Sequence, residues 1–428
     1  MPEFLDLYVQ DLNIKAKWLK EAYSRVASFD AEGYLKELFR KYWINDTFPE
    51  SYPEEFKVIA VDSSSRHITM ANGGIFYVVR AIAVSSTRTE FKKIYVGFDY
   101  SPTDKYREVI SRTMEWLEHE TILDALNKGF KGYVLIDGSI YGRLAHVPLE
   151  INSVYNRGFM IKYFETLIKL LNVSKEKNVP LIGISKESRS SFFREFLIRN
   201  AILKLARELG IGESKVYSTL HMALDRRRKV VEEVEKMPDV IKELMKEYIT
   251  QKPDFQLIMN YAVTPGYTVP LLLSIPARTK RAFKLIKDGP EKYLRSAFPS
   301  LSRDKDFVEH ALNVVKELPN LPSIISFHIL PQINDTPMRV DVPSWVFGIE
   351  HKLSEVDFNE VVSVNIDKIL EIIFAGYCGL ENYNIWLTAA DRKVKLKRSA
   401  FESIYLPKFE EIIGGTVTSR GYRRVRFP

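Results

Sequence analysis

The sequence predicts a mixed α/β fold, and two short apolar runs carry most of that prediction. The first run, residues 58–61, ends at Asp62, and the second, residues 133–136, ends at Asp137. A short uninterrupted apolar run is typical of a strand that is buried on both faces. If the two strands are neighbours in one sheet, their carboxylates converge beside a glutamate-rich helix. Such a cluster is hard to keep deprotonated without a divalent metal ion, because like charges raise one another's pKa.

The order of the predicted elements narrows the fold class. Asn72, Gly73 and Gly74 supply the turn between the first two strands. Strands are predicted at 57–62, 75–85, 92–98, 132–137 and 180–185, with helices at 104–128 and 154–173. Three antiparallel strands followed by alternating helices and parallel strands form a mixed sheet. The order β-β-β-α-β-α-β is that of the ribonuclease-H-like fold.

The rest of the chain is predicted to add helices to this sheet. The additions are an N-terminal helical region at 1–50, a charge-dense helical insertion at 196–250, and a C-terminal helix with a basic tail at 376–428. Strands resume at 324–330 and 338–342. Because no internal repeat or low-complexity linker interrupts the chain, residues 1–428 are predicted to form one elaborated domain.

Composition excludes several classes of protein. The chain has 428 residues, of which 46% are hydrophobic and 27% charged, as in an ordinary globular protein. No run of about 18 apolar residues occurs, which argues against a transmembrane helix. The N-terminus lacks the layout of a secretory signal. The single cysteine, Cys378, excludes an internal disulfide framework and a cysteine-rich zinc site. We expect a cytoplasmic protein with no membrane association.

Positive charge is concentrated near the C-terminus. The net charge of the chain is +7, and residues 391–428 contain ten Lys or Arg against four Asp or Glu. The charge is gathered in two clusters, 391–398 and 420–426, of which the second includes Tyr422. Basic patches of this kind suit a phosphate backbone. The alternative is a set of solvated faces and a basic tail that binds nothing.

A third carboxylate is expected from the helix at 104–128. Glu115, Glu118 and Glu120 are the candidates, and we favour Glu120 because it shares a helical face with Trp116. With Asp62 and Asp137 it would form an oxygen-rich site suited to Mg²⁺ or Mn²⁺. Two such ions can clamp the attacking water and the leaving oxygen of a phosphodiester. The alternative is that both aspartates are strand-end turn formers.

Two basic residues follow the strand at 180–185. Lys186 and Arg189 lie just beyond its carboxyl end, on the edge where Asp62 and Asp137 are expected. Lys186 would hold a phosphate as a point charge, unless it is a solvated loop lysine.

Several short motifs in this order resemble the NurA nucleases. They are residues 61–64, 135–139, 183–186 and 338–343, and Gly376-Tyr377 before a basic helix. The resemblance covers most of the chain. It departs at the long helical region 196–250, at Ser63, where many members have glycine, and at Asp391, where the final helix usually carries histidine.

This resemblance implies a Mn²⁺-dependent (or Mg²⁺-dependent) nuclease, with two ions, that resects DNA double-strand breaks. Members act as homodimers with the HerA hexameric helicase-translocase. They show 5′→3′ exonuclease activity on single- and double-stranded DNA and endonuclease activity on single strands. Asp62, Glu120 and Asp137 would be metal ligands and Lys186 a phosphate contact. The other expected DNA contacts are Arg66, Arg189, Tyr377, Arg423 and Arg424.

Asp391 is predicted to be the fourth metal ligand. In the final helix, predicted at 381–396, Leu387, Ala390 and Val394 recur at three- and four-residue steps, so one face is buried. Asp391 sits on or beside that face, where a carboxylate is costly unless it is paired or binds metal. The alternative is a surface ion pair with Lys395, four residues later.

Two other classes of function stay open at this point. Asp62-Ser63-Ser64-Ser65 and Asp137-Gly138-Ser139 resemble phosphate-binding turns, which would suit an actin-like ATPase. That class needs glycines after the first aspartate and a late glycine-rich motif, and neither is present in convincing form. A non-catalytic DNA-binding relative is disfavoured, because unpaired carboxylates beside phosphates weaken binding without metal.

Overall fold

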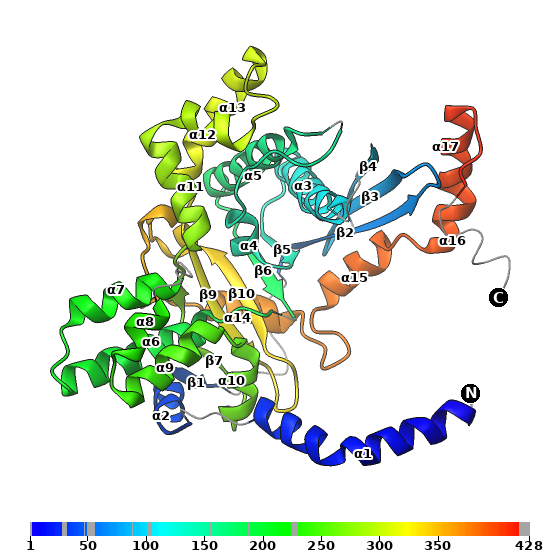
Figure 1. Ribbon diagram of the computed structural model, residues 1–428. Coiled ribbons are helices and arrows are strands. Elements are labelled where there is room, and N and C mark those ends of the chain that lie inside the picture. The colour runs from blue at the N-terminus through cyan, green and yellow to red at the C-terminus, as the bar shows by residue number, and fades with distance from the viewer. Residues whose placement is uncertain are drawn as a thin grey trace. The chain divides into compact units, whose positions relative to one another are not determined.

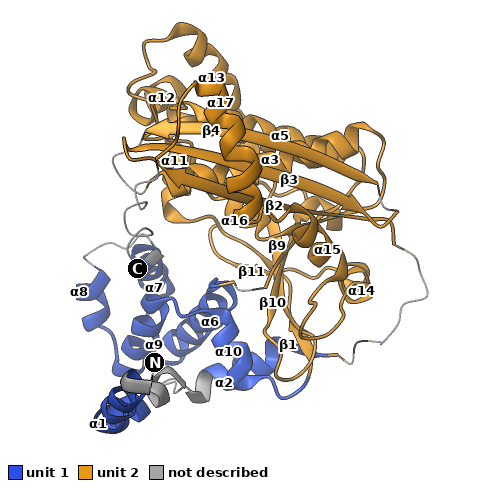
Figure 2. Ribbon diagram, turned by 90° about the vertical axis from the view of Figure 1, so that its right-hand side faces the viewer, with its two compact units in different colours: residues 1–45, 189–264 blue, residues 46–188, 265–428 orange. Residues whose placement is uncertain are grey.

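A computed structural model describes residues 2–27, 32–46, 48, 56–87, 89–100, 105–154, 156–186, 188–224 and 230–418. The chain divides into two compact units (Figure 2). Unit 1 comprises Met1–Asn45 and Arg189–Thr264, and unit 2 comprises Asp46–Ser188 and Pro265–Pro428. The predicted helical insertion at 196–250 therefore lies within unit 1, together with most of the N-terminal helical region.

Unit 1 is built almost wholly from helices. They are α1 (Pro2–Ala27), α2 (Glu32–Tyr42), α6 (Phe192–Glu208), α7 (Glu213–Leu224), α8 (Val230–Glu235), α9 (Asp239–Thr250) and α10 (Asp254–Tyr261), with β1 (Trp43–Asn45) after α2. Phe39 of α2 packs against Phe193 of α6, with ring centroids 6.0 Å apart. The buried Asp254 accepts a hydrogen bond of 2.8 Å from the backbone N–H of Arg194, and so satisfies the first turn of α6.

Unit 2 contains the predicted mixed sheet. Its strands are β2 (Val58–Thr69), β3 (Gly74–Ser85), β4 (Glu90–Tyr100), β5 (Tyr133–Asp137), β6 (Leu181–Ser185), β7 (Gly266–Thr268), β8 (Leu271–Leu272), β9 (Ile324–Leu330), β10 (Met338–Pro343) and β11 (Glu360–Val361). The spatial order is β7-β9-β10-β6-β5-β2-β3-β4, and β8 joins β9 to β11. β2, β3 and β4 are antiparallel, whereas β5 and β6 run parallel to β2.

Helices cover both faces of this sheet (Figure 1). One face carries α3 (Tyr106–Asn127) and α5 (Phe159–Glu176), and the other carries α14 (Asp367–Ala375) and α15 (Ile385–Val394). Along β2, Val58 and Ala60 share a buried cluster with Leu387 of α15. Because side chains alternate along a strand, Asp62 points to the α15 face and Ser63 to the α3 face.

The remaining elements of unit 2 connect these layers. They are α4 (Ile140–Leu144), α11 (Ala277–Asp288), α12 (Pro290–Ala297), α13 (Lys305–Glu317), η1 (Leu318–Asn320), η2 (Ser344–Phe347), η3 (Leu353–Glu355), α16 (Arg398–Ala400), η4 (Phe401–Tyr405) and α17 (Leu406–Ile413). In the part of the chain that is described, no helix is long and apolar enough to cross a membrane.

The predicted strands agree with the structure at their centres and differ at their ends. β2 continues to Thr69, well past its predicted end at 62, because it pairs with β3 as far as Thr69 opposite Ile75. The continuation is polar, from Ser63 to His67, so apolar periodicity could not reveal it. The predicted helix at 154–173 begins later, at Phe159.

Candidate active site

Asp62 and Asp137 lie at matching positions on adjacent strands. In the parallel pairing of β2 with β5, Val61 is opposite Ile136, so the next residue on each strand is one of the two aspartates. Gly138 follows with φ +113°, a conformation that favours glycine, and turns the chain away from the sheet. Ser139 then caps α4 by accepting a hydrogen bond of 2.7 Å from the backbone N–H of Gly142. The predicted convergence of these two residues is therefore present.

The carboxyl group of Asp62 is strongly perturbed. Its pKa is raised to about 7, first by burial and then by Glu118, Asp137 and Asp391, while the backbone N–H of Ser63 opposes the rise. That N–H donates to Oδ1 of Asp62 at 2.7 Å. Near neutral pH the group is therefore divided between its protonated and ionised forms. It lies among carboxylates with too little positive charge to balance them.

Asp137 has two partners, Lys186, which was expected at this edge of the sheet as a phosphate contact, and Tyr383, which the sequence did not single out. The hydroxyl of Tyr383 donates to Oδ2 of Asp137 at 2.9 Å, and Nζ of Lys186 lies 3.4 Å from the same oxygen. The Lys186 ammonium also lies 4.6 Å from the centroid of the Tyr383 ring. Burial, followed by Asp137, raises the pKa of Tyr383 above its usual range, so the hydroxyl keeps its proton. Tyr383 precedes the helix cap Asn384, and no local pattern marks it as a site residue.

Asp391, on α15, lies near the acidic cluster of Asp62 and Asp137. The predicted buried face of the final helix is confirmed, since Leu387, Ala390 and Val394 are all buried. Asp391 itself is exposed, yet it is close enough to raise the pKa of Asp62. With Lys186 and Tyr383 it lines a cavity of about 360 Å³. Among the described ion pairs there is none between Asp391 and Lys395.

The α3 carboxylate beside Asp62 is Glu118, not the expected Glu120. The Glu120 carboxylate lies 3.2 Å from Nζ of Lys93 and accepts a 3.0 Å hydrogen bond from Thr166 of α5. Glu120 does share a face with Trp116, as expected, but that face packs on α5, where the Trp116 indole also bonds Thr166. Two residues along a helix correspond to a turn of about 200°, so Glu118 points the other way, toward the sheet.

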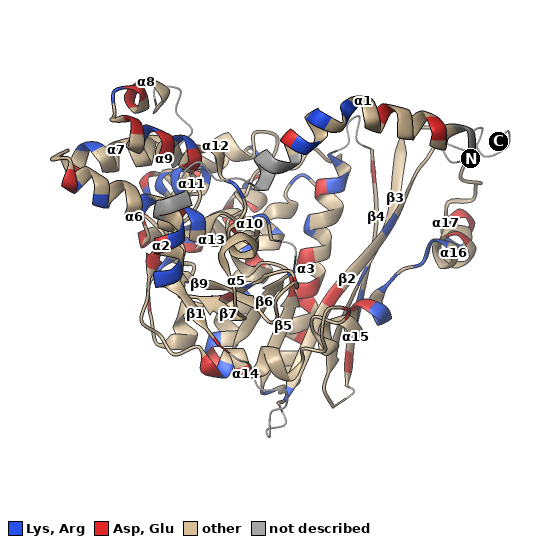
Figure 3. Ribbon diagram, turned by 90° about the horizontal axis from the view of Figure 1, so that it is seen from below, with Lys and Arg blue, Asp and Glu red and all other residues tan. Residues whose placement is uncertain are grey.

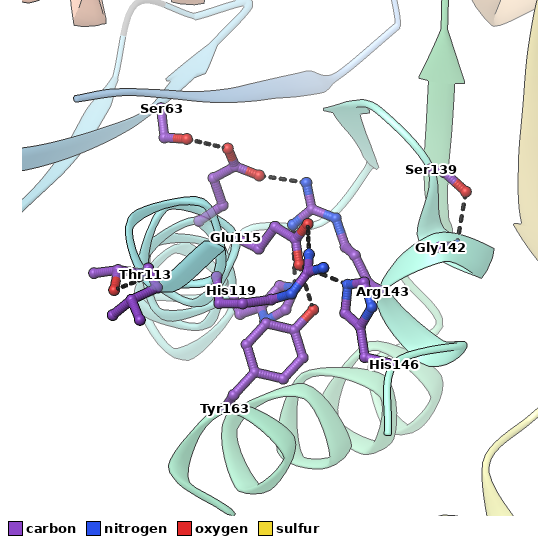
Figure 4. Close-up of polar contacts among 12 residues, drawn as sticks. Ser63, Thr113, Glu115, His119, Ser139, Gly142, Arg143, His146 and Tyr163 are labelled. Atoms are coloured by element: carbon purple, nitrogen blue, oxygen red, sulfur yellow. Dashed lines mark hydrogen bonds and ion pairs between the residues drawn. The ribbon is translucent and has the colours of Figure 1, made fainter. Parts of the chain in front are cut away.

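Glu118 belongs to a buried polar network between α3, α4 and α5 (Figure 4). Its carboxylate accepts hydrogen bonds from the Ser63 hydroxyl and from the Arg143 guanidinium. Arg143 also lies 3.1 Å from Nε2 of His119. Burial raises the pKa of Glu118, and Arg143 and Ser63 oppose that rise.

Glu115 completes this network. Its carboxylate is bonded by Tyr163 at 2.7 Å, by Arg112 at 2.9 Å and by His146 at 3.1 Å. Burial alone would raise the pKa of Glu115, but His146, Arg143 and Arg112 lower it below its usual range. Unlike Asp62, this carboxylate already has its counter-charges within the protein.

The donor chemistry at Asp62 and Asp137 fits a hard divalent cation. Carboxylate oxygens are the ligands of Mg²⁺ and Mn²⁺, and the raised pKa of Asp62 records an excess of negative charge. The described residues nevertheless hold no group of three or more His, Cys, Asp or Glu arranged around one ion position. The two aspartates on the α15 face, with Asp391 and Glu118 nearby, are the carboxylates that would hold such an ion.

Comparison with known proteins supports the assignment of a family. The NurA domain profile matches residues 56–396, which is most of the chain and includes Asp62, Asp137 and Asp391. The chain belongs to the NurA family. No curated protein of similar sequence was found.

Solved structures of NurA proteins resemble the chain over almost its whole length. The NurA nuclease from Sulfolobus solfataricus matches with 14% identity and a TM-score of 0.54, covering 96% of this chain and 97% of the other. A NurA crystal structure with bound dAMP and manganese matches with 16% identity and a TM-score of 0.40, covering 94% and 97%. The first of these likenesses shows a common fold.

Other residues expected to contact DNA in this NurA-family chain occupy different settings. Arg66 is exposed and donates from Nε to the Leu396 carbonyl at 2.9 Å. Tyr377 donates to Asp335 at 2.6 Å. Arg189 is the first residue of the second segment of unit 1. Arg423 and Arg424 lie outside the described residues.

A further aspartate of the NurA domain, the buried Asp341, is fully engaged in hydrogen bonds. Asp341 of β10 accepts from the Ser139 hydroxyl at 2.7 Å, from the Ser326 hydroxyl at 2.9 Å and from Arg339 at 3.0 Å. It therefore fixes the turn that follows Asp137. Both of its carboxylate oxygens are thus occupied by donors within the protein.

Proposed function

We propose that this chain is a metal-dependent deoxyribonuclease that hydrolyses phosphodiester bonds. The observation that carries the proposal is the pairing of Asp62 and Asp137 on adjacent parallel strands, where burial and like charge raise the pKa of Asp62 to about 7. A carboxylate cluster with this charge excess is stabilised by a divalent cation.

Asp62 and Asp137 would hold the cation, with Glu118 and Asp391 as the further carboxylates. Tyr383 and Lys186 both bond Oδ2 of Asp137, which fixes the orientation of that carboxylate. None of the described residues donates to Oδ1, so this oxygen is available to the cation. When bound, the cation supplies Lewis-acid stabilisation of the charge that develops on the phosphate.

Lys186 has a second role in this proposal. Its side chain is half exposed and lines the same cavity as Asp391. Its ammonium is a mobile point charge that can turn from Asp137 toward a phosphate oxygen of the substrate. The ring of Tyr383, beneath that ammonium, limits the directions in which it can turn.

Membership of the NurA family extends the proposal beyond the site. We propose a ribonuclease-H-like sheet, 5′→3′ exonuclease and single-strand endonuclease activity, and a pair of Mn²⁺ or Mg²⁺ ions. We also propose that the chain acts as a homodimer with a HerA-type translocase in the resection of double-strand breaks, as the family resemblance implies.

One assay tests the activity directly. End-labelled single-stranded DNA is incubated with the purified chain and Mn²⁺, Mg²⁺ or EDTA, and the products are resolved on a gel. We expect cleavage with Mn²⁺ and none with EDTA. Absence of cleavage with either ion would overturn the proposal. ATP hydrolysis without DNA cleavage would instead favour the actin-like alternative.

A matched pair of variants tests which α3 carboxylate serves the site. Glu118→Gln should lower the cleavage rate about 100-fold or more, as removal of one transition-state contact often does. Glu120→Gln should leave the rate within about twofold, since Glu120 forms a partly exposed ion pair with Lys93 and faces α5. Equal losses in both variants would contradict the assignment of Glu118.

A further inference from the structure

A basic groove lies over strands β3 and β4, next to the end of α15. Its volume is about 490 Å³, and its walls include Arg80, Lys92 and Lys393 as well as the apolar side chains of Ile94 and Tyr405. Lys92 and Lys393 have 67% and 47% of their side chains exposed, so both ammonium groups can reach a ligand. Figure 3 shows the basic positions along β3 and at the end of α15.

The charges of this groove are arranged around a single acid. Glu90 bonds both Lys92, at 2.5 Å, and Lys393. Arg80 donates to the backbone carbonyl of Lys393 at 3.1 Å, and so carries its charge to the rim of the groove. The cations outnumber the acid, and surface ion pairs of this kind are weak enough to exchange partners.

The strand register connects the groove to the acidic cluster. Asp62 is opposite Ile82 on β3, and Ile82 is opposite Lys92 on β4, so the three residues form one row across the sheet. Adjacent strands lie about 4.8 Å apart, which puts Lys92 roughly 10 Å from Asp62. That span equals about three nucleotides at the roughly 3.4 Å rise of a stacked strand.

Helix α15 connects the acidic cluster to the basic groove. Asp391 acts on Asp62, and two residues later Lys393 forms a wall of the groove. Past the helix, Lys395, Lys397 and Arg398 are also exposed. The acidic cluster is thus continued along the same face of the sheet by cations.

We propose that this groove holds part of a single strand of DNA, and that a phosphodiester about three nucleotides along the same strand lies at Asp62 and Asp137. The inference rests on the proposed function. The groove has the size of a small-molecule pocket, so it has room for a nucleotide. Lys92, Lys393 and Arg80 contact phosphates, while Ile94 and the partly buried ring of Tyr405 contact a base.

A second groove provides the control. It lies between α5 and α13, has the same volume of about 490 Å³, and is lined by Glu165, Glu176 and Glu317 with Lys169 and His310. Its acidic character predicts no affinity for a phosphate backbone. Lys169→Gln therefore removes an exposed lysine without affecting strand binding.

The test measures binding of a long fluorescent single strand by anisotropy, in EDTA, across a salt series. The Lys92→Gln/Lys393→Gln variant should bind roughly tenfold more weakly, with a salt slope reduced by about 0.7 for each phosphate that the variant no longer neutralises. Glu90→Gln should bind a fewfold more tightly, because it frees both lysines. Tyr405→Leu should weaken binding roughly fivefold without changing the salt slope.

Two results would overturn the proposal that the groove binds DNA: wild-type affinity in the double lysine variant, or weaker binding in Glu90→Gln. Thermal melting of each variant confirms that it is folded. Cleavage of a dinucleotide with Mn²⁺ separates the two proposals, since a dinucleotide is too short to reach from the carboxylates to the groove. If wild type cleaves nothing while the binding pattern holds, the proposed function fails and the groove stands.

Discussion

Two half-buried carboxylates of unit 2, Glu115 and Asp62, have opposite electrostatic surroundings. Glu115, on the α3 side, is surrounded by Arg112, His146 and Tyr163, and its pKa is lowered. Asp62, on the α15 side, is surrounded by other carboxylates, and its pKa is raised to about 7. This difference shows that burial alone does not identify a carboxylate of an active site. What distinguishes Asp62 is that the protein leaves its charge unbalanced.

The largest expected effect is on catalysis, at the acidic cluster of Asp62 and Asp137, whose negative charge is unbalanced. Asp137→Asn should reduce DNA cleavage by at least about 1,000-fold, because the variant loses a charged oxygen ligand on which the reaction depends. Circular dichroism should show an intact fold. Asp335→Asn, on the wall of the cavity that Lys186 and Asp391 also line, is the control and should retain activity. Substantial cleavage by Asp137→Asn would show that the α15-side cluster is not catalytic.

A substitution in the network around Glu115, where charges are balanced, should change the stability of the protein. Glu115→Gln should lower the free energy of unfolding by about 1–3 kcal/mol, because it loses the charge-assisted hydrogen bonds with the partly buried Arg112 and His146. Denaturant unfolding measures this loss. Glu120→Gln, whose ion pair with Lys93 is partly exposed, should lose less than about 1 kcal/mol. If the two variants lose the same free energy, the network around Glu115 does not have the structural role assigned to it.

In metal-free protein, Asp62→Asn should raise the free energy of unfolding instead of lowering it. The pKa of Asp62 is higher in the folded chain, about 7, than its usual value of 3.8, so folding favours the protonated acid. Its stabilising contribution is complete below the unfolded pKa and is lost as pH rises through the folded pKa. At about pH 8 the variant should therefore be more stable than wild type by a few kcal/mol, at about 1.4 kcal/mol per pKa unit.

That gain should shrink as the pH falls from 7 toward 4 and vanish below it, which thermal melting in EDTA at several pH values can follow. Mn²⁺ should raise the melting temperature of wild type at alkaline pH and have little effect on Asp62→Asn. A variant less stable than wild type at about pH 8 would show that Asp62 is already balanced.

The smallest effect is expected at Asp391. Because this residue is exposed and is the weakest contributor to the raised pKa of Asp62, Asp391→Ala should raise the half-saturating Mn²⁺ concentration and lower the rate by roughly threefold to tenfold. Titration of activity with Mn²⁺ measures both. Lys395→Ala is the control, and a matching change in that variant would favour the surface-pair alternative.

The sequence by itself determined the features that depend on local pattern. The apolar runs before Asp62 and Asp137, and the three- and four-residue steps of Leu387, Ala390 and Val394, specify two strands and one helix. Their burial follows from periodicity alone. The glycine at 138, held at φ +113°, is equally local, since a turn of that kind favours glycine.

Only the tertiary structure decided which partners these residues meet. Glu118 and Glu120 are two positions apart on one helix, and the sequence does not say whether the sheet or α5 lies on a given side of it. Tyr383 reaches Asp137 across 246 positions of the chain, and Arg143 meets Glu118 across 25. Charge balance at a buried carboxylate is the sum of such long-range contacts, which is why the packed sheet and helices were needed to distinguish Asp62 from Glu115.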